Sequence, residues 1–357
     1  MKRRILALLI VFVMVVGFAA CAGNDPAPTT PAPEASPPAG AETVDASDDP
    51  PVTFVWADSN APGSIKVQMA QVFADRVAYL SDGNITIEIH HSAVLGAEPA
   101  VLDTMIGGGG TIQMARIPTF AFNPFGADMS RLLTVPFTFA DRDHFWTFAA
   151  SDLAAEIGQE TLDLGIGLRT LFFAEEGFRH FYTSSPVLTV DDLQNMQIRT
   201  PNDPLLVGVV EALGANATII SPAEVYSAIQ TGIVDGAENS VSTFVSNSQY
   251  EVAPYLAMSG HSLAVSQVVI LEEVWQSLTE NQRNILLQAA EYTRDFTREL
   301  AESVEQEGLG VLRANDVGIT VIEGADREPW LALAASVIEE HSGHMPELYQ
   351  RILDLAG

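Results

Sequence analysis

The feature that most constrains the fold is an alternation of short apolar strands with amphipathic helices. Residues 53–57 read as a buried strand, apolar residues recur every three or four positions over residues 65–80, and residues 84–91 alternate as a second strand. A strand, a helix and a strand in this order predict parallel strands joined by a crossover helix. We therefore expect an α/β fold.

The same alternation continues along the chain. We predict further strands at residues 111–117, 167–173, 177–182, 196–198, 217–220, 265–271 and 319–322, and further helices at residues 153–164, 205–213, 222–230, 328–338 and 345–355. Thr279 with Gln282 three residues later forms a capping-box pattern, and it opens a proline-free helical pattern that runs to about residue 312. The glycine run at residues 107–110 lacks the Lys-Ser/Thr of a phosphate loop and predicts a helix-to-strand turn.

The first 50 residues do not share this pattern. A basic start precedes an apolar stretch at residues 5–19, which is short for a transmembrane helix, and small residues precede Cys21, the one cysteine of the chain. We predict a signal peptide at residues 1–20 and lipidation of Cys21, with simple secretion or a retained anchor as alternatives. Residues 21–50 are rich in Pro, Ala, Thr, Ser and acids, which predicts a disordered tether after the lipidated cysteine.

The charge of the chain limits its partners. It holds 17 basic and 46 acidic residues, a formal net charge of −29. Such a surface repels nucleic acid and offers anionic lipid no basic stripe. It also repels an anionic ligand at long range, but screening over about 10 Å limits that repulsion, whereas arginines in a cleft act at contact distance. Local geometry should therefore decide whether an anion binds.

The strongest signal for a binding site is an arginine at a predicted strand end. Met196 and Ile198 alternate with a polar residue, and Arg199 follows them just before a Pro-Asn turn and a helix. Open α/β sheets bind ligands at this edge, and a guanidinium matches a carboxylate through two parallel hydrogen bonds. We expect Arg199 to bind an anion; the alternative is a structural ion pair with an acid such as Glu224.

Further candidates flank this arginine in the sequence. Arg179 follows a glycine in a strand-like run, Asn202 lies in the Pro-Asn turn, and Glu238 and Asn239 fall in a loop predicted after Asp235. Two cations and an amide would then converge on one anion, with Asn239 touching the ligand and Glu238 orienting its neighbours.

Three candidates lie nearer the N-terminus. Trp56 and Asp58 stand at the end of the first predicted strand, where they would line the pocket; a core aromatic and a loop acid near a helix are the alternative. Arg116 ends the strand at residues 111–117 and would add positive charge to the cleft, unless it faces solvent. We predict neither catalytic residues nor a metal site, because G-x-S-x-G, H-E-x-x-H and C-x-x-C are absent and the histidine pairs lack a third ligand.

Four stretches together carry a resemblance to a known family. They are LGAEPAVLDTMIGGGGTIQMA, VPFTFADRDHF, PVLTVDDLQNMQIRTPNDPLLVGVVEALGANATIISPAEVYSAIQTGIVDGAENS and LAMSGHS. They resemble the signature of the solute-binding proteins of TRAP transporters, the DctP family, over most of the chain after residue 51. The resemblance implies that Arg199 binds the substrate carboxylate, that Asn239 assists, and that Arg179 is the additional arginine of many members.

The resemblance also implies an architecture. It is a two-lobed fold like that of class II periplasmic binding proteins, with hinge strands and a long helix that crosses both lobes. We expect lobe I at residues 51–176, completed by about 263–305, and lobe II at residues 177–262, completed by about 306–357.

The function that follows from the resemblance is capture without catalysis. A monomer outside the cytoplasm, lipid-anchored through Cys21 and free of cofactors, would close its lobes on an organic anion such as a C4-dicarboxylate or a sugar acid. It would then deliver the anion to the small and large membrane subunits of a TRAP transporter. The alternatives are a ligand-binding component of a sensory system and a secreted α/β enzyme.

Overall fold

The computed structural model describes residues 49–357; the predicted signal peptide, Cys21 and most of the predicted tether lie outside the described residues. The strands are β1 (Val52–Ala57), β2 (Ile85–His90), β3 (Met114–Pro118), β4 (Leu168–Thr183), β5 (Gln197–Thr200), β6 (Asn216–Ile219), β7 (Gly236–Ser240), β8 (Tyr255–Leu271) and β9 (Gly318–Val321). The helices are α1 (Ile65–Leu80), α2 (Glu98–Ile106), α3 (Asp128–Leu132), α4 (Arg142–Ala149), α5 (Asp152–Asp163), α6 (Pro204–Ala212), α7 (Val225–Gln230), α8 (Val241–Ser246), α9 (Glu272–Ser277), α10 (Glu280–Ala314), α11 (Glu328–Ser342) and α12 (Pro346–Leu353).

The strands of the described residues form one sheet in the order β2-β1-β3-β8-β4-β7-β5-β6, with β9 on β8. At one end β1 pairs in parallel with β2 and β3, and at the other end β5 pairs in parallel with β6 and β7. The antiparallel strands β4 and β8 join these two groups. We call the part built on β1–β3 the first lobe and the part built on β5–β7 the second lobe, and the α/β two-lobed prediction is confirmed.

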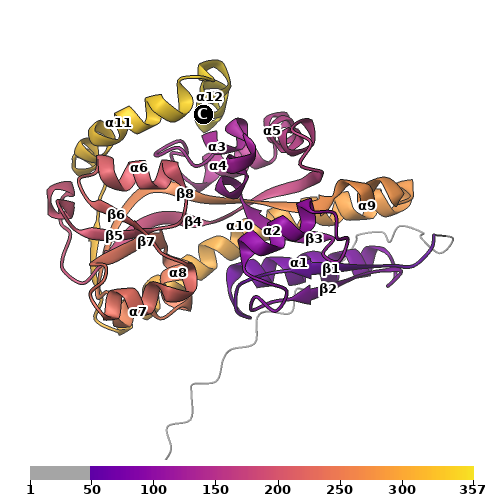
Figure 1. Cartoon of the computed structure of the whole chain (residues 1–357), viewed down its shortest axis with the longest axis horizontal. Helices are drawn as coiled ribbons and strands as arrows, with labels where there is room; N and C mark the ends of the chain where they lie inside the picture. The colour runs from indigo at the N-terminus through magenta and orange to yellow at the C-terminus, as the bar shows by residue number, and fades with distance from the viewer. Residues whose placement is uncertain (1–48) are drawn as a thin grey trace, which may run out of the picture. The chain divides into compact units, whose positions relative to one another are not determined.

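Helices cover both faces of the sheet. In Figure 1, α3, α4, α5, α6, α11 and α12 lie above the strands, whereas α7, α8 and α10 lie below those of the second lobe. The largest cluster of buried apolar side chains lies under the upper helices and reaches from Phe145 in α4 to Val209 in α6 and Trp330 in α11. Separate clusters serve the first lobe, around Trp56 and Phe73, and the second lobe, around Tyr182 and Phe244. Each lobe therefore has apolar packing of its own.

The crossing between the lobes is a continuous pair of strands. We predicted separate strands at residues 167–173 and 177–182, but β4 runs unbroken from Leu168 to Thr183 because β8 pairs along its length. The register of the pair shifts at three places, and the middle one lies between Glu175 and Phe178. Gly177, with φ +107°, sits inside this shift, in a backbone conformation that side chains with a Cβ rarely adopt. We refer to this irregular part of the long strands, residues 175–178, as the hinge.

The prediction that Glu238 and Asn239 lie in a loop is wrong. Both residues belong to β7, which pairs with β4 on one side and with β5 on the other. The Asp235-Gly236 pair suggested a turn, but tertiary pairing on both sides overrides that local preference.

The long helix begins where its capping signal predicts. Thr279 Oγ1 accepts from the Gln282 backbone N–H, and Gln282 Oε1 accepts from that of Thr279, at 3.2 and 3.0 Å. The side-chain amide of Gln282 also donates to the Pro50 carbonyl at 2.8 Å. From there α10 continues for 35 residues, about 52 Å at the rise of an α-helix, and packs on α1 and α8. The lobe boundaries in sequence stay a prediction.

Two glycines of α10 offer a matched test of this packing. A Cβ on Gly308 would lie 2.9 Å from Val241 Cγ1 in α8, whereas a Cβ on Gly310 would meet no atom within 4 Å. Alanine is favoured over glycine within a helix by about 0.5–1 kcal/mol. We expect Gly310→Ala to raise the midpoint of thermal unfolding and Gly308→Ala to lower it, since valine is stiff and α8 must shift. Calorimetric scans of both variants check this, and a stabilising Gly308→Ala would contradict the close approach.

Candidate functional site

Arg199 lies near the carboxyl end of β5, where the chain turns into α6. Pro201 follows the strand, and Asp203 caps α6 by accepting from the Leu206 N–H at 3.0 Å. The Arg199 side chain is only 3% exposed, and its Nε donates to the Ile220 carbonyl at 2.8 Å. The expected position at a strand end is therefore present, in a buried setting.

The charge of Arg199 has no counter-ion within residues 49–357. It forms no ion pair with a carboxylate there, and Glu224, the alternative partner, is exposed. Arg76 is also buried without a carboxylate in that part of the chain, but it stacks on Tyr292 at 4.5 Å from the ring centroid. Burial lowers the pKa of Arg199. A buried cation without compensation is unfavourable, so this position favours the binding of an anion.

Arg179, in contrast, is already paired. Its Nε and Nη2 donate to the two carboxylate oxygens of Glu238 at 2.6 and 2.7 Å, and Nη2 also reaches the Glu238 carbonyl. His261 Nε2 lies 3.4 Å from Glu238 Oε2, and Ser259 Oγ lies 2.8 Å from His261 Nδ1. Burial alone would raise the pKa of Glu238, but Arg179 and His261 outweigh it and bring the pKa to about 2. Glu238 therefore holds Arg179 in one orientation beside the hinge.

Asn239 stands on the same face of the sheet as Arg199. Arg199 pairs with Ala237 across the parallel strands β5 and β7, and Asn239 follows two residues later, so the two side chains point to one side. Asn239 Oδ1 accepts from the Ser240 N–H at 2.9 Å, and its amide nitrogen makes no hydrogen bond within the described part of the chain. Asn202 lies exposed in the turn before α6. An uncompensated guanidinium and a half-buried amide donor are thus aimed in one direction.

In the first lobe Arg116 is buried between two carboxylates. It is 4% exposed, Nη1 donates to Glu176 at 2.5 Å and Nη2 to Glu98 at 3.0 Å, while Nε has no partner in residues 49–357. The alternative of a solvent-facing arginine is therefore wrong. Its charge, however, is already met by acids of this chain.

Trp56 and Asp58 lie close to one another in sequence but differ in setting. Trp56 is fully buried and its ring lies 5.9 Å from that of Phe73, which makes it a core side chain. Asp58 is 4% exposed; Oδ1 accepts from the backbone and side-chain nitrogens of Asn60, and Oδ2 has no partner among the described residues. A ligand role is open to Asp58 through that oxygen, whereas Trp56 supports the strand beneath.

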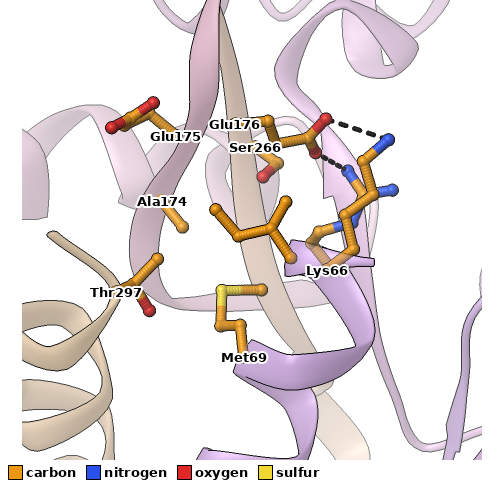
Figure 2. A pocket seen from close by; sticks show the side chains of 9 residues that line it. Lys66, Met69, Ala174, Glu175, Glu176, Ser266 and Thr297 are labelled. Atoms are coloured by element: carbon orange, nitrogen blue, oxygen red, sulfur yellow. Dashed lines mark hydrogen bonds and ion pairs between the residues drawn. The ribbon is translucent and has the colours of Figure 1, made fainter. Parts of the chain in front are cut away.

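A small, tightly closed pocket lies where α1, α10 and the two long strands meet. Its lining residues are Ile65, Lys66, Met69, Arg116, Ala174, Glu175, Glu176, Ser266 and Thr297. Figure 2 shows Glu176 turned toward Lys66, to which it is bonded at 2.9 Å, while Glu175 points to the other side of β4. Ser242 Oγ of the second lobe donates to the Glu176 carbonyl at 3.0 Å. The pocket therefore adjoins the hinge, close to the strand end that carries Asn239.

Sequence reasoning missed Lys66, Glu98, Glu176 and Ser266. A signal for one of them was available, because Glu175 and Glu176 follow an apolar strand directly and precede Gly177. Two acids at the end of a buried strand need cationic partners. Local pattern cannot identify those partners, which are Arg142 for Glu175 and both Lys66 and Arg116 for Glu176.

Glu175 forms a second charged cluster at the hinge. Arg142 of α4 donates to Glu175 Oε1 at 2.6 Å and to Glu305 Oε2 of α10 at 2.5 Å, so two carboxylates share one guanidinium. The Gly177 N–H also donates to Glu175. Burial raises the pKa of Glu175 to about 7, although Arg142 opposes the shift.

Residues 49–357 hold no cluster of three His, Cys, Asp or Glu side chains that would suit a metal ion. None of the helices in that part of the chain is long and apolar enough to cross a membrane.

Comparison with known proteins places this geometry in a family. The family model of the bacterial extracellular solute-binding proteins of family 7, DctP, matches residues 56–343. The sialic acid-binding periplasmic protein SiaP of Vibrio cholerae is 28% identical over 270 residues, which cover 75% of this chain and 81% of SiaP. A solute-binding protein of Chromohalobacter salexigens is 28% identical over 289 residues, 79% of this chain and 82% of that protein.

Solved structures agree with the sequence comparison. A TRAP periplasmic solute-binding protein of Pseudomonas putida F1 with bound D-glucuronate has a TM-score of 0.79 at 27% identity, covering 84% of this chain and 96% of that one. A Bradyrhizobium protein in complex with α/β-D-galacturonate has a TM-score of 0.79 at 27% identity, with 85% and 100% covered. The resemblance seen in the sequence is confirmed.

The Glu175 cluster predicts a dependence of stability on pH. Because the pKa of Glu175 rises from 4.5 to about 7 on folding, its contribution to stability is fully present below pH 4.5 and is lost as the pH rises through 7. We expect Glu175→Gln to flatten the fall of the thermal midpoint between about pH 5 and pH 8. Glu211→Gln, at an exposed glutamate of α6 that forms no ion pair within residues 49–357, serves as the control of equal charge. Parallel pH curves for wild type and Glu175→Gln would contradict the assignment.

Proposed function

The chain belongs to family 7 of the bacterial extracellular solute-binding proteins, the DctP family of TRAP solute-binding proteins, and from that membership we propose that it captures an organic anion by closing its lobes and delivers it to the membrane subunits of a TRAP transporter. One observation carries the proposal. Arg199 is a buried guanidinium without a counter-ion in residues 49–357, and it shares a sheet face with Asn239. A carboxylate would supply the missing charge through two parallel hydrogen bonds.

A sugar acid is the substrate class that we favour. Proteins of the same fold were solved with D-glucuronate, galacturonate and galactonate, each a carboxylate on a hydroxylated carbon chain. The residues around the hollow beside the hinge carry polar groups over an apolar floor. These groups would meet the hydroxyls of a ligand whose carboxylate lies at Arg199 once the lobes open to admit it.

Arg199, Asn239 and Asn202 would contact the carboxylate end of the ligand. Arg179, whose charge Glu238 already balances, would hold the neighbouring strand in place. Arg116 and Asp58 would face the other end from the first lobe, and Trp56 would support them from the core. The lipid anchor at Cys21 and a monomeric state complete the proposal: a tether at residues 21–50 would hold the folded lobes at the outer surface of the cell membrane.

The first prediction concerns the anchor of the carboxylate. Removing one partner of a buried, hydrogen-bonded charge pair costs about 2–5 kcal/mol, so Arg199→Ala should weaken binding of D-galacturonate or D-glucuronate at least about a hundredfold. Calorimetric titration measures it. Arg199→Lys should also bind poorly, because lysine keeps the charge but loses the planar fork.

Arg313→Ala provides the control, since Arg313 is an exposed arginine of α10. It should leave affinity and thermal midpoint unchanged. If Arg199→Ala bound as tightly as wild type while both variants folded normally, Arg199 would not be the anchor.

The net charge of −29 predicts an unusual salt response. An acidic surface slows the approach of an anion, and salt screens that repulsion. We expect the association rate constant for a sugar acid to rise between about 20 and 200 mM NaCl, while the dissociation rate constant changes less. Stopped-flow fluorescence of the native tryptophans would record both rates, and a falling association rate would argue for a positively charged entrance.

A further inference from the structure

The pocket beside the hinge holds its charges in pairs. Glu176 lies 2.9 Å from Lys66 Nζ and 2.5 Å from Arg116 Nη1, and Glu98 takes the other terminal nitrogen of Arg116. Burial alone would raise the pKa of Glu176. The nearby charges of Arg116 and then Lys66 outweigh burial and hold the pKa below its usual range. Asp58 adds a further acid near Arg116. The cations of the pocket are thus matched or outnumbered by carboxylates of the chain itself.

A second carboxylate on the ligand would therefore find no free counter-ion here. It would have to displace Glu176 or Glu98 from Arg116, or lie beside them as a like charge. Like charges that face one another in a partly desolvated site are strongly unfavourable. The situation is opposite to that of Arg199, whose guanidinium has no carboxylate partner in residues 49–357.

Hydroxyl groups of a ligand, in contrast, would find hydrogen-bond partners in this pocket. Ser266 Oγ and Arg116 Nε are buried polar atoms without a hydrogen-bond partner in the described part of the chain, and both residues line this pocket. Lys66 has further N–H groups to donate, and the oxygens of Glu176 can accept. A hydroxyl both donates and accepts, so it can satisfy such groups without disturbing the ion pairs.

Resting on the function proposed above, we infer that Glu176 is a specificity-determining residue that neutralises Lys66 and Arg116 and so closes the far end of the site to a second carboxylate. The protein then selects acids with one carboxylate and several hydroxyls over the dicarboxylates of the same carbon skeleton. Glu176 acts by pairing with the two cations, so that neither can bind a carboxylate of the ligand. This exclusion of a second carboxylate is separate from the attraction of the first one to Arg199.

Two pairs of ligands test this directly. D-Galacturonate and galactarate share a carbon chain and differ in whether the far end is an aldehyde, closed into a ring, or a carboxylate; D-glucuronate and D-glucarate form the second pair. We expect the wild-type protein to prefer each uronate by at least about fiftyfold in calorimetric titration. Equal affinity for acid and diacid would overturn the inference while leaving the proposed function in place.

Glu176→Gln is the decisive variant. It frees one guanidinium nitrogen and the lysine ammonium, so the affinity for galactarate should rise relative to that for galacturonate by at least about tenfold. Glu156→Gln makes the same change of net charge on the exposed surface and should leave the ratio unchanged. A ratio unmoved by Glu176→Gln would refute its role, since a merely structural carboxylate would weaken both ligands alike.

Glu98→Gln is the second variant, for the case in which Glu176→Gln does not fold. It frees only the other terminal nitrogen of Arg116 and should shift the ratio in the same direction by a smaller factor. If the wild type bound neither member of either pair, the proposed sugar-acid function would fall and the inference with it. That result differs from equal binding of both, which removes the inference alone.

Discussion

The pairing of β4 with β8 is the constraint on which the rest depends. These strands hold 16 and 17 residues, and each runs through both lobes. Parallel strands pack outward from them on either side, so the two lobes share one sheet although each has its own apolar cluster. The register of this pair shifts at three places, and the shift at Glu175–Phe178, with Gly177 inside it, interrupts the ladder near the middle of the strands.

Charge is distributed unevenly around that crossing. Arg116, Arg142 and Arg179 each bond to acids of this chain, and those acids come from strands and helices far apart in sequence. These bonds fix the positions of the side chains at the hinge and neutralise the positive charge there. Arg199 lies outside the network, with a carbonyl oxygen as its bonded partner in the described residues. This contrast distinguishes Arg199 from the three arginines at the crossing, whose charges are balanced by acids of the chain.

Local signals in the sequence predicted much of this framework. The capping box at Thr279 placed the start of α10 correctly, and the alternation before Arg199 placed that residue at a strand end. Prediction failed where distant strands decide the outcome: Asp235-Gly236 looked like a turn, yet β4 and β5 hold the following residues in a strand. The pairing of Arg179 with Glu238, 59 residues away, and of Arg116 with Glu176, 60 residues away, follows from the fold alone.

One contact of the long helix has a mechanical consequence. The side-chain amide of Gln282, in the first turn of α10, donates a hydrogen bond to the Pro50 carbonyl, and that of Asn84, just before β2, donates one to the Asp49 carbonyl. A force applied at residue 49 would therefore act on two places at once, the start of α10 and the residue before β2 in the first lobe. Neither contact involves β4 or β8, so such a force would reach the crossing between the lobes only through α10 and the first lobe.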